Sequence, residues 1–561
     1  MSRSGRKYGV SGDGGLDVQN SRVTVSLLVG CLLGTPAVPA LAQVAPIPDA
    51  GAVLGESRRD QQAIERRNAA ATSGPAVIGP VPPQAVIPPT GGATFRLNRV
   101  VFDPSQFITP AELEAIAARY VGRDVDDAGV QQLLKAVNDL YAERRVITAL
   151  AYLPAQDLRK GELRIAMVEG RLGKVDVQGN TRLPTEAATT VVTTPAGGVV
   201  DVPALERDVA WFNKTRSAQI QASLQPGANF GLTDIHLAVL EPPTNQLQIF
   251  TDDQGVEAVG QYQLGTHFQR NGLFGLDDKV TGYGVVAEGN LNGNLAYSTP
   301  FNPWGGRIGV SGSMGSIRVY RGAYADLHIR GRSESYGVNL SQPLWIDGTW
   351  ALLANAAVTE SRSRSRQSGI DISDDTTRKY TLGATLSYTG RLIQASLSPN
   401  WTVAETRFAL GGAPIDFHLF GGTYSAVLHL PWNFSLSVAG SGQWSDTTSL
   451  ASDQLFQIGG PTTVRGYPTS GVAGHSGYTA AFELHRSLAD WVKGLDLYGF
   501  VDTGTVWATH PSRITLTSVG AGVTWDHDNR IVSDLSVAAP TTTELGRHDP
   551  FVYYRLTVKF E

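Results

Sequence analysis

The C-terminal part of the chain, from Leu247 to Phe560, alternates between apolar and polar positions along short segments. A period of two places successive side chains on opposite faces of a β-strand. The apolar rows of three such segments are Tyr336, Val338 and Leu340; Trp350, Leu352, Ala354, Ala356 and Val358; and Tyr380, Leu382, Ala384, Leu386 and Tyr388. Segments of about ten residues with aromatic ends are typical of transmembrane strands with one lipid face and one wet face. The pattern predicts an all-β transmembrane barrel over residues 246–561.

The number of strands follows from the length of this region. About 315 residues, at roughly 20 for each strand and its loop, are compatible with about 16 antiparallel strands, and the sequence also allows 14 or 18. Residues 342–348 are expected to form a short periplasmic turn, and residues 361–377 a long polar loop on the outer side. A soluble β-sandwich fits poorly, because each predicted strand has polar residues on one face and lipid-like apolar residues on the other.

The final strand has an apolar outward row and a polar inward row. The outward residues are Val552, Tyr554, Leu556, Val558 and Phe560, and the inward residues are Arg555, Thr557 and Lys559. A near-terminal aromatic residue resembles the recognition signal for insertion into the outer membrane, although Glu561 follows the phenylalanine. This resemblance implies the barrel-assembly machinery as a partner.

One stretch of the barrel region, residues 445–477, shows no strand alternation. Its centre, from Phe456 to Pro468, is rich in glycine and carries a single cation, Arg465. Connections of this length between strands tend to be functional. We expect this loop to fold back into the barrel and to place Arg465 against a carboxylate on the wall.

The strand that follows offers such a carboxylate. Leu495, Leu497 and Val501 share one face, so the opposite face, with Asp496, Tyr498, Phe500 and Asp502, is expected to line the lumen. Glu483 also faces inward, with Thr479 and His485, and is a second candidate. A guanidinium in a confined lumen favours a carboxylate that accepts two parallel hydrogen bonds. Leaving either charge unpaired costs about 3–5 kcal/mol if the site is fully desolvated.

Before the barrel, the pattern predicts two tandem α+β modules of about 75 residues each, at 93–170 and 171–245. In the first, strand 95–102 precedes a helix with a capping box, Thr109-Pro110-Ala-Glu112. A second helix places Val130, Leu133, Leu134, Val137 and Tyr141 on one face, and strands 146–153 and 162–169 follow. Residues 171–245 repeat this β-α-α-β-β order with weaker signals.

The N-terminal segments have different compositions. Residues 1–42 are predicted to form a secretory signal, with Arg22, an apolar stretch and Ala40-Leu41-Ala42. A lipoprotein signal that uses Cys31 is the alternative. Residues 43–74 contain a polar helical segment, Asp49 to Ala71, and residues 75–92 form a proline-rich linker. A helix on such a tether can occupy one place and leave it, whereas a disordered tail fits the same residues.

Composition excludes several classes of function. The net charge of -5 and pI near 6.1 argue against a nucleic-acid partner. The single cysteine, Cys31, allows no intrachain disulfide and no zinc-finger spacing. No Gly-x-Ser-x-Gly elbow, His-Glu-x-x-His motif or phosphate loop occurs. We therefore predict no enzymatic activity, no cofactor and no catalytic or metal-binding residues.

Residues 146–170 resemble the first POTRA domain of the two-partner-secretion transporters. These transporters are the TpsB type, the filamentous-haemagglutinin and haemolysin transporters, within a superfamily of POTRA-containing outer-membrane barrels. The residues that carry the resemblance are Leu153, Pro154, Gln156, Asp157 and Leu158, followed by Glu169 and Gly170. A generic α+β module is the alternative.

Two further motifs match the hallmarks of this superfamily. They are Val464-Arg465-Gly466-Tyr467 and Phe500-x-Asp502-x-Gly504. The resemblance implies an inward-folded loop whose arginine pairs with Asp502, with Glu483 as a second partner. Alone, Arg-Gly-Tyr also fits an ordinary surface turn.

The resemblance implies an outer-membrane pore in contact with lipid, with its POTRA domains in the periplasm. These domains would recognise a secreted partner exoprotein by its N-terminal secretion domain, and the barrel would translocate it to the cell surface. Haemolysin or adhesin secretion and activation belong to this class. The segment from Asp49 to Ala71 would plug the lumen at rest. The alternative is an assembly factor that inserts other outer-membrane proteins, and a general porin is a weaker third possibility.

Overall fold

The computed structural model describes residues 48–69, 77–78, 94–275, 277–508, 513–546 and 549–560. The predicted signal sequence, residues 1–42, lies outside the described residues, as does most of the proline-rich linker. None of the described helices is long and apolar enough to cross a bilayer.

The first α+β module has the predicted β-α-α-β-β order. Its elements are β3 (Arg99–Phe102), α2 (Pro110–Ala117), α3 (Asp127–Glu143), β5 (Ala149–Tyr152) and β6 (Glu162–Glu169). The Thr109 and Glu112 capping box starts α2, and the Asp126 side chain accepts a hydrogen bond from the Gly129 N–H at the start of α3. The apolar faces of both helices pack on the sheet around Leu133, Val137 and Leu163, which are fully buried.

The strand predicted over residues 95–102 is divided in two. β2 (Phe95–Arg96) pairs with β4 (Asp124–Val125), whereas β3 runs parallel to β6. The break occurs because Leu97 is fully buried and the N–H groups of Asn98 and Arg99 both donate to the Gly161 carbonyl. A two-residue period does not reveal this local turn.

The second module repeats the order. Its elements are β7 (Arg171–Gln178), α4 (Thr185–Thr189), α5 (Val202–Thr215), β8 (Gln219–Pro226) and β9 (Leu232–Leu240). Val209, Ile220 and Ile235 are fully buried in its core. A two-residue strand from the linker, β1 (Val77–Ile78), pairs in parallel with the edge strand β8.

Sixteen strands from the described residues close into an antiparallel barrel, in agreement with the predicted number. They are β10 (Asn245–Asp252), β11 (Gln263–Asn271), β12 (Lys279–Ala287), β13 (Asn290–Pro300), β14 (Arg307–Arg318), β15 (Ile329–Ile346), β16 (Trp350–Gln367), β17 (Ile370–Thr389), β18 (Ile393–Phe408), β19 (Ile415–Leu430), β20 (Phe434–Ser445), β23 (Ser476–Ser487), β24 (Leu495–Trp507), β25 (Ile514–His527), β26 (Ile531–Pro540) and β27 (Phe551–Phe560). The barrel closes where β10 pairs with β27.

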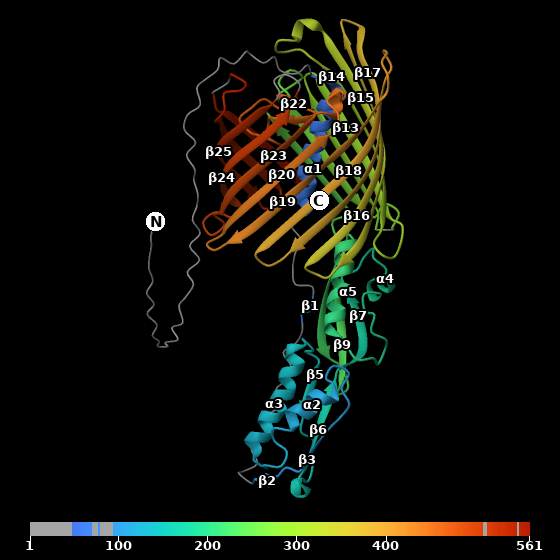
Figure 1. The fold of residues 1–561 in the computed structure, drawn as a ribbon, viewed down its shortest axis with the longest axis vertical. Coiled ribbons are helices and arrows are strands. Elements are labelled where there is room, and N and C mark those ends of the chain that lie inside the picture. Colours follow the sequence, from blue (N-terminus) through green and yellow to red (C-terminus); the bar gives the residue numbers. More distant parts are fainter. Residues whose placement is uncertain are drawn as a thin grey trace, which may run out of the picture. The chain divides into compact units, whose positions relative to one another are not determined.

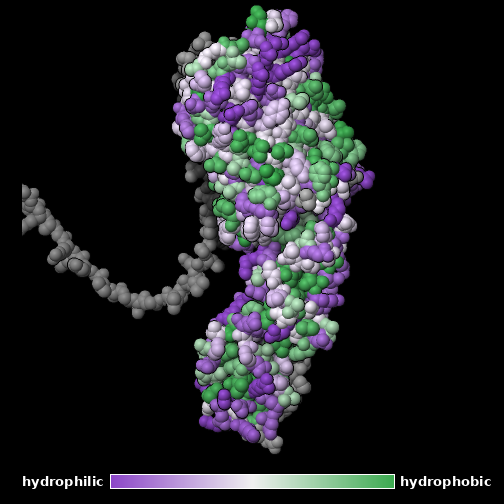
Figure 2. Space-filling model, turned by 90° about the vertical axis from the view of Figure 1, so that its right-hand side faces the viewer, coloured by the Kyte–Doolittle hydropathy of each residue, from purple (hydrophilic) through white to green (hydrophobic). Residues whose placement is uncertain are grey.

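The outer wall carries the predicted apolar rows. Tyr336, Val338 and Leu340 are exposed on β15, and Tyr380 and Leu382 are exposed on β17. Figure 2 shows apolar side chains across the middle of this wall and hydrophilic side chains gathered at one end. This end is the one at which β15 begins and β16 ends.

The prediction of a long loop at residues 361–377 is wrong. β16 continues to Gln367 and β17 begins at Ile370, so only Ser368 and Gly369 form the turn. Both turn residues have positive φ, at 50° and 88°, as a tight hairpin requires. From Ser361 to Arg366 the serines point inward and the arginines outward, so both faces of this segment are polar and the usual apolar signal of a strand is absent.

The helix α1 (Ala50–Ala69) lies inside the barrel (Figure 1). It contacts β13 to β16 on one side of the wall. Ala50, Val53, Leu54 and Ile64 are buried there, and the remaining contacts are largely polar.

Candidate functional site in the barrel lumen

The connection between β20 and β23 forms a finger that returns into the barrel. It contains a 3-10 turn (Ser452–Gln454) and a small hairpin made of β21 (Phe456–Ile458) and β22 (Val472–Gly474). Gly459 and Gly460 have φ of 105° and 94°, a region open to glycine, and they redirect the chain after β21. Val464 and Tyr467 at the tip are buried in an apolar cluster against Val506, Ile514 and Leu516.

Arg465 at the tip of the finger meets Asp502 on β24. Its Nε and Nη2 atoms donate to the two carboxylate oxygens of Asp502, each at 2.7 Å, and its backbone N–H donates to Oδ2 at 3.1 Å. The Asp502 side chain has no solvent exposure, and that of Arg465 is 12% exposed. Two parallel charge-assisted bonds in a buried site fix the orientation of the guanidinium as well as its position.

Two other residues named from the sequence complete the environment of the guanidinium. Glu483 on β23 accepts from Arg465 Nη2 at 2.7 Å, so this cation has two carboxylates. The guanidinium carbon lies 3.5 Å from the centre of the Phe500 ring, which supplies a cation–π contact. The structure therefore brings Arg465, Glu483, Phe500 and Asp502 together.

Backbone conformation and close packing explain why the two motifs have glycine at positions 466 and 504. Gly466 has φ of 85°, and its N–H donates to the Tyr553 hydroxyl of β27 at 2.9 Å. A Cβ at Gly504 would lie 2.9 Å from a methyl of Val464, too close for ordinary packing. Tyr467 is anchored because its hydroxyl donates to the Thr517 carbonyl at 2.7 Å. The finger is thus locked to β24, β25 and β27.

Sequence reasoning missed part of this wall. Tyr553 was not selected, although it lies on the inward row of β27 with Arg555. Asp534 on β26 accepts from the Tyr498 hydroxyl at 3.1 Å. His485 bridges two carboxylates, with Nε2 3.1 Å from Glu483 and Nδ1 2.6 Å from Asp496. The alternation of inward positions, which identified Tyr498, His485 and Asp496 from the sequence, could also have found Tyr553 and Asp534.

The helix α1 is bound to the wall by a second buried ion cluster. Asp60 accepts from Arg555 Nη1 at 2.7 Å, and Arg555 also donates to Asp252 on β10 through Nε at 2.9 Å and Nη2 at 2.7 Å. The Tyr283 hydroxyl of β12 donates to Asp60 at 2.8 Å. Because β10 and β27 form the closing pair of the barrel, this cluster attaches α1 to the closure.

The same helix also contacts the finger. Glu56 accepts from the Thr462 hydroxyl at 2.5 Å, and Arg59 donates to the Gln457 side chain at 3.3 Å. At its N-terminal end, Asp49 accepts from the hydroxyls of Ser363 and Ser365. The helix and the finger therefore share a polar interface within the lumen.

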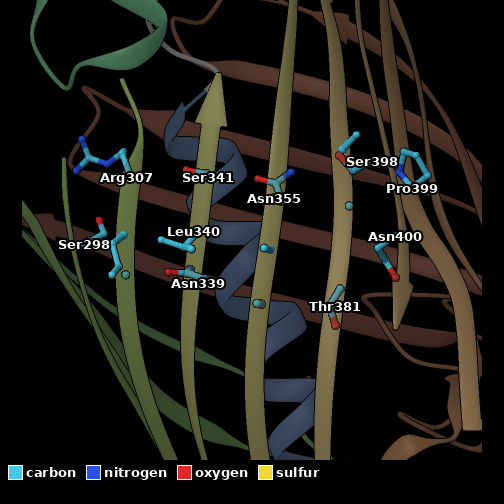
Figure 3. Close-up of a pocket in the computed structure, with 16 residues that line it drawn as sticks. Ser298, Arg307, Asn339, Leu340, Ser341, Asn355, Thr381, Ser398, Pro399 and Asn400 are labelled. Carbon is cyan, nitrogen blue, oxygen red and sulfur yellow. The ribbon is translucent and has the colours of Figure 1, made fainter. Parts of the chain in front are cut away.

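The part of the wall formed by β13 to β18, away from the tip of the finger, is chemically different. A cavity of about 400 Å³ lies along β13 to β18 (Figure 3). Its polar lining is formed by hydroxyl and amide side chains with one cation, Arg307: Ser298, Asn339, Ser341, Asn355, Thr381, Ser398 and Asn400. This wall offers hydrogen-bonding groups with little fixed charge.

The residues of the POTRA signature hold the first module together. Gln156 makes two hydrogen bonds with the backbone of Arg164 on β6, at 2.6 and 2.7 Å. Glu169 accepts from the Ser105 and Tyr141 hydroxyls at 2.5 and 3.0 Å. Leu153 and Leu158 pack on the core, and a Cβ at Gly170 would lie 2.3 Å from the Thr233 hydroxyl. Pro154 carbonyl accepts from Gln156 at 3.3 Å, while Asp157 is exposed.

A closed barrel with an inward finger, a helix in its lumen and α+β modules before it defines a class of outer-membrane transporter. Residues 231–525 match the family of haemolysin secretion/activation proteins ShlB/FhaC/HecB. Residues 95–170 match the POTRA domain of ShlB type. The chain belongs to this family of two-partner-secretion transporters, which places its barrel in the outer membrane and its POTRA region in the periplasm.

Individual relatives agree with this assignment. The chain is 23% identical over 405 residues to the outer membrane transporter CdiB of Dickeya dadantii (strain 3937), covering 69% of this chain and 71% of the relative. It is 21% identical over 484 residues to the heme/hemopexin transporter protein HuxB of Haemophilus influenzae (strain 86-028NP), covering 81% and 85%. The solved structure of CdiB from Escherichia coli has the same fold, with a TM-score of 0.66, 20% identity, and coverage of 93% and 100%.

Proposed function

We propose that this transporter exports one secreted exoprotein, which its two POTRA modules recognise in the periplasm through the N-terminal secretion domain of the cargo. The observation that carries the proposal is the set of contacts made by α1. This helix lies in the lumen, and ion pairs and hydrogen bonds to residues 60, 56 and 49 hold it there. On departure these polar groups would exchange their partners for water, and the helix would expose only a small apolar face, formed by Ala50, Val53, Leu54 and Ile64.

The wall along β13 to β18 supports a route for the cargo once α1 has left. An unfolded polypeptide presents a backbone N–H and C=O at nearly every residue. Serine, threonine and asparagine side chains can satisfy these groups at many positions. Because Arg307 is the one charged residue in this lining and its apolar side chains are mostly small, we expect no segment of the cargo to be held strongly. The chain itself would perform no catalysis, and folding of the cargo outside the cell would prevent its return.

In this proposal, Arg465 and Asp502 fix the finger against one wall so that the rest of the lumen stays open. The finger also contacts α1 through Thr462 and Gln457. Contact with lipid on the apolar rows, and insertion of the barrel by the assembly machinery through the final strand, belong to the same proposal. The apolar outward row on β27, ending at Phe560, supports that step.

A reversible cross-link tests whether α1 must move. The Asn292 amide of β13 donates to the Ser57 hydroxyl of α1 at 2.8 Å, so Ser57→Cys and Asn292→Cys introduce thiols at two neighbouring positions, which an oxidant or a short bis-thiol-reactive reagent can cross-link. Cys31 belongs to the predicted signal sequence, so the mature chain would contain no other thiol. Under oxidising conditions the double variant should stop secreting its exoprotein, and a reductant should restore secretion.

Each single cysteine variant provides a control, because it carries one of the two substitutions and cannot form the cross-link. The cross-linked fraction is measured by migration on a non-reducing gel, and secretion by the amount of exoprotein in the culture medium. Full secretion by a completely cross-linked transporter would show that α1 stays in place and would reject the proposal.

A further inference from the structure

Six arginines cover the outward face of the barrel wall where β14, β15 and β16 extend beyond the apolar belt. They are Arg318, Arg330, Arg332, Arg362, Arg364 and Arg366. Their side chains alternate with buried inward residues and follow the same outward rows as Val310, Tyr336 and Val358. These arginines are therefore on the outside of the barrel, away from the lumen.

The strand register sets these like charges beside one another. Arg330 is the cross-strand partner of Arg318 on one side and of Arg366 on the other, and Arg332 is opposite Arg364. Like charges directly opposite one another in a sheet are destabilising. Arg318, Arg330 and Arg366 therefore lie side by side on three adjacent strands, and a bound anion would reduce the repulsion between them.

Carboxylates within the protein compensate only part of this charge. Arg362 makes two bonds of 2.7 Å with Asp374, and Asp371 accepts from both Arg364 and Arg366. Among the described residues, no ion pair joins Arg318, Arg330 or Arg332 to a carboxylate. Counting Glu334 with the two aspartates, six guanidinium groups face three carboxylates, a local charge of +3 in a chain of net charge -5.

The patch lies directly beyond the end of the lipid-facing surface. Tyr336 is the last large apolar residue of the outward row on β15, and Glu334, Arg332 and Arg330 follow it. On β15, at about 3.3 Å per residue and a strand tilt of about 40°, Arg332 and Arg330 lie roughly 10 and 15 Å beyond Tyr336. Figure 2 shows hydrophilic side chains gathered at this end of the barrel. Headgroups of the outer leaflet occupy this depth.

We propose that this arginine patch binds the phosphate groups of a phosphorylated glycolipid in the outer leaflet, the chemical class that includes lipid A. A guanidinium presents paired N–H donors that match phosphate oxygens, and its charge persists at any physiological pH. A lipid anchored beside Tyr336 and Val358 would hold its phosphates at the height of Arg332 and Arg364. A soluble acidic protein would gain nothing from this continuity with the apolar belt.

A charge-matched pair of variants tests the proposal. The triple variant Arg318→Gln, Arg330→Gln, Arg332→Gln removes the three arginines that have no carboxylate, so it breaks no ion pair within the barrel. The control Arg391→Gln, Lys493→Gln, Arg530→Gln removes three exposed cations from turns at the opposite end. Full-length protein is purified in neutral detergent, and native mass spectrometry measures binding of diphosphoryl lipid A. Dephosphorylated lipid A, phosphatidylglycerol and inorganic phosphate are measured in parallel.

We expect the triple variant to bind diphosphoryl lipid A at least tenfold more weakly than the unmodified protein, and the control to bind it normally. Removing the phosphates from the lipid should cause a similar loss. Resistance of the folded barrel to unfolding by detergent without heating verifies that both variants fold. Equal binding by the triple variant would overturn the proposal. So would equally tight binding of inorganic phosphate or phosphatidylglycerol, since either would identify a general anion surface.

Discussion

Asp60 of the lumenal helix α1 and Arg555 of the final strand form an ion pair inside the lumen, with Nη1 and Oδ1 2.7 Å apart. The side chains are 12% and 6% exposed. Arg555 retains Asp252 as a second carboxylate whether or not α1 is present. The wall therefore keeps its cation neutralised when the helix departs, and the cost of departure falls on Asp60, which then enters water.

Asp60→Asn should weaken the attachment of α1. The substitution removes a charge-assisted hydrogen bond worth about 1.5–3 kcal/mol, which corresponds to a shift of about 10- to 100-fold in occupancy of the lumen. Single-channel recording in planar bilayers should show more frequent openings and a higher mean conductance. Arg66→Gln is the control, because Arg66 is exposed on the same helix. If Asp60→Asn has the same conductance as the control, this ion pair does not hold the plug.

The pairing of the finger with the wall leads to a second prediction. Arg465→Lys keeps the charge but loses the two parallel bonds to Asp502, and Asp502→Asn keeps the shape but loses the charge. Losing one partner of a buried pair costs up to about 3–5 kcal/mol, and Glu483 alone does not reproduce the two parallel bonds to Asp502, so we expect the finger to undock. Both variants should assemble a normal barrel and secrete little exoprotein. Outer-membrane fractionation measures assembly, and immunoblotting of the medium measures secretion. Normal secretion by both variants would remove the pair from the mechanism.

Glu241, between β9 and β10, should make the second POTRA module sensitive to acid. Burial alone would raise the pKa of this carboxyl, but hydrogen bonds from the Leu183 N–H, the Thr181 hydroxyl and Arg182 outweigh burial and hold the pKa at about 2. A depressed pKa stabilises the folded state above the unfolded pKa. That contribution is lost as pH falls from about 4.5 towards 2.

The expected signature is a fall in the unfolding temperature of the helical signal in this pH window. Circular dichroism at 222 nm of the full-length protein in detergent follows the helices. At neutral pH, Glu241→Gln should unfold at a lower temperature, because the substitution lowers the free energy of unfolding by about 1–3 kcal/mol. The variant should also lose most of the pH dependence between pH 4.5 and pH 2. Identical pH profiles for the two proteins would show that another group carries the acid sensitivity.

The sequence was sufficient to predict the barrel and both α+β modules, because burial on one face imposes a period on the chain. Residues 361–366 could not be recognised in this way, because serine and arginine alternate there without an apolar face. The partners of Arg465 could be predicted, because the two-residue period of β24 identifies which of its side chains face the lumen. Arg555 and Asp60 are separated by 495 positions, and α1 has no period that identifies its contacts. Pairings of this kind depend on the closed barrel and cannot be predicted from local pattern.

The glycine in the Phe500-x-Asp502-x-Gly504 motif provides a test of packing between finger and wall. In Gly504→Ala, the new methyl would lie 2.9 Å from a methyl of Val464 and 3.2 Å from the Tyr478 carbonyl. Val464 is fully buried and its side chain cannot shift to relieve the clash, so the finger should move away from β24. Overpacking of this type typically costs about 1–3 kcal/mol. We expect secretion to fall while the barrel still assembles.

A second substitution distinguishes this clash from general damage to β24. Val464→Ala removes the methyl that the new Cβ meets, so the double variant should secrete more than Gly504→Ala alone. The Tyr478 carbonyl remains close, so recovery should be partial. Val464→Ala alone is the control for the loss of two buried methyl groups from the tip of the finger. If the double variant secretes less than either single variant, the two positions act independently, and the steric explanation for Gly504 is wrong.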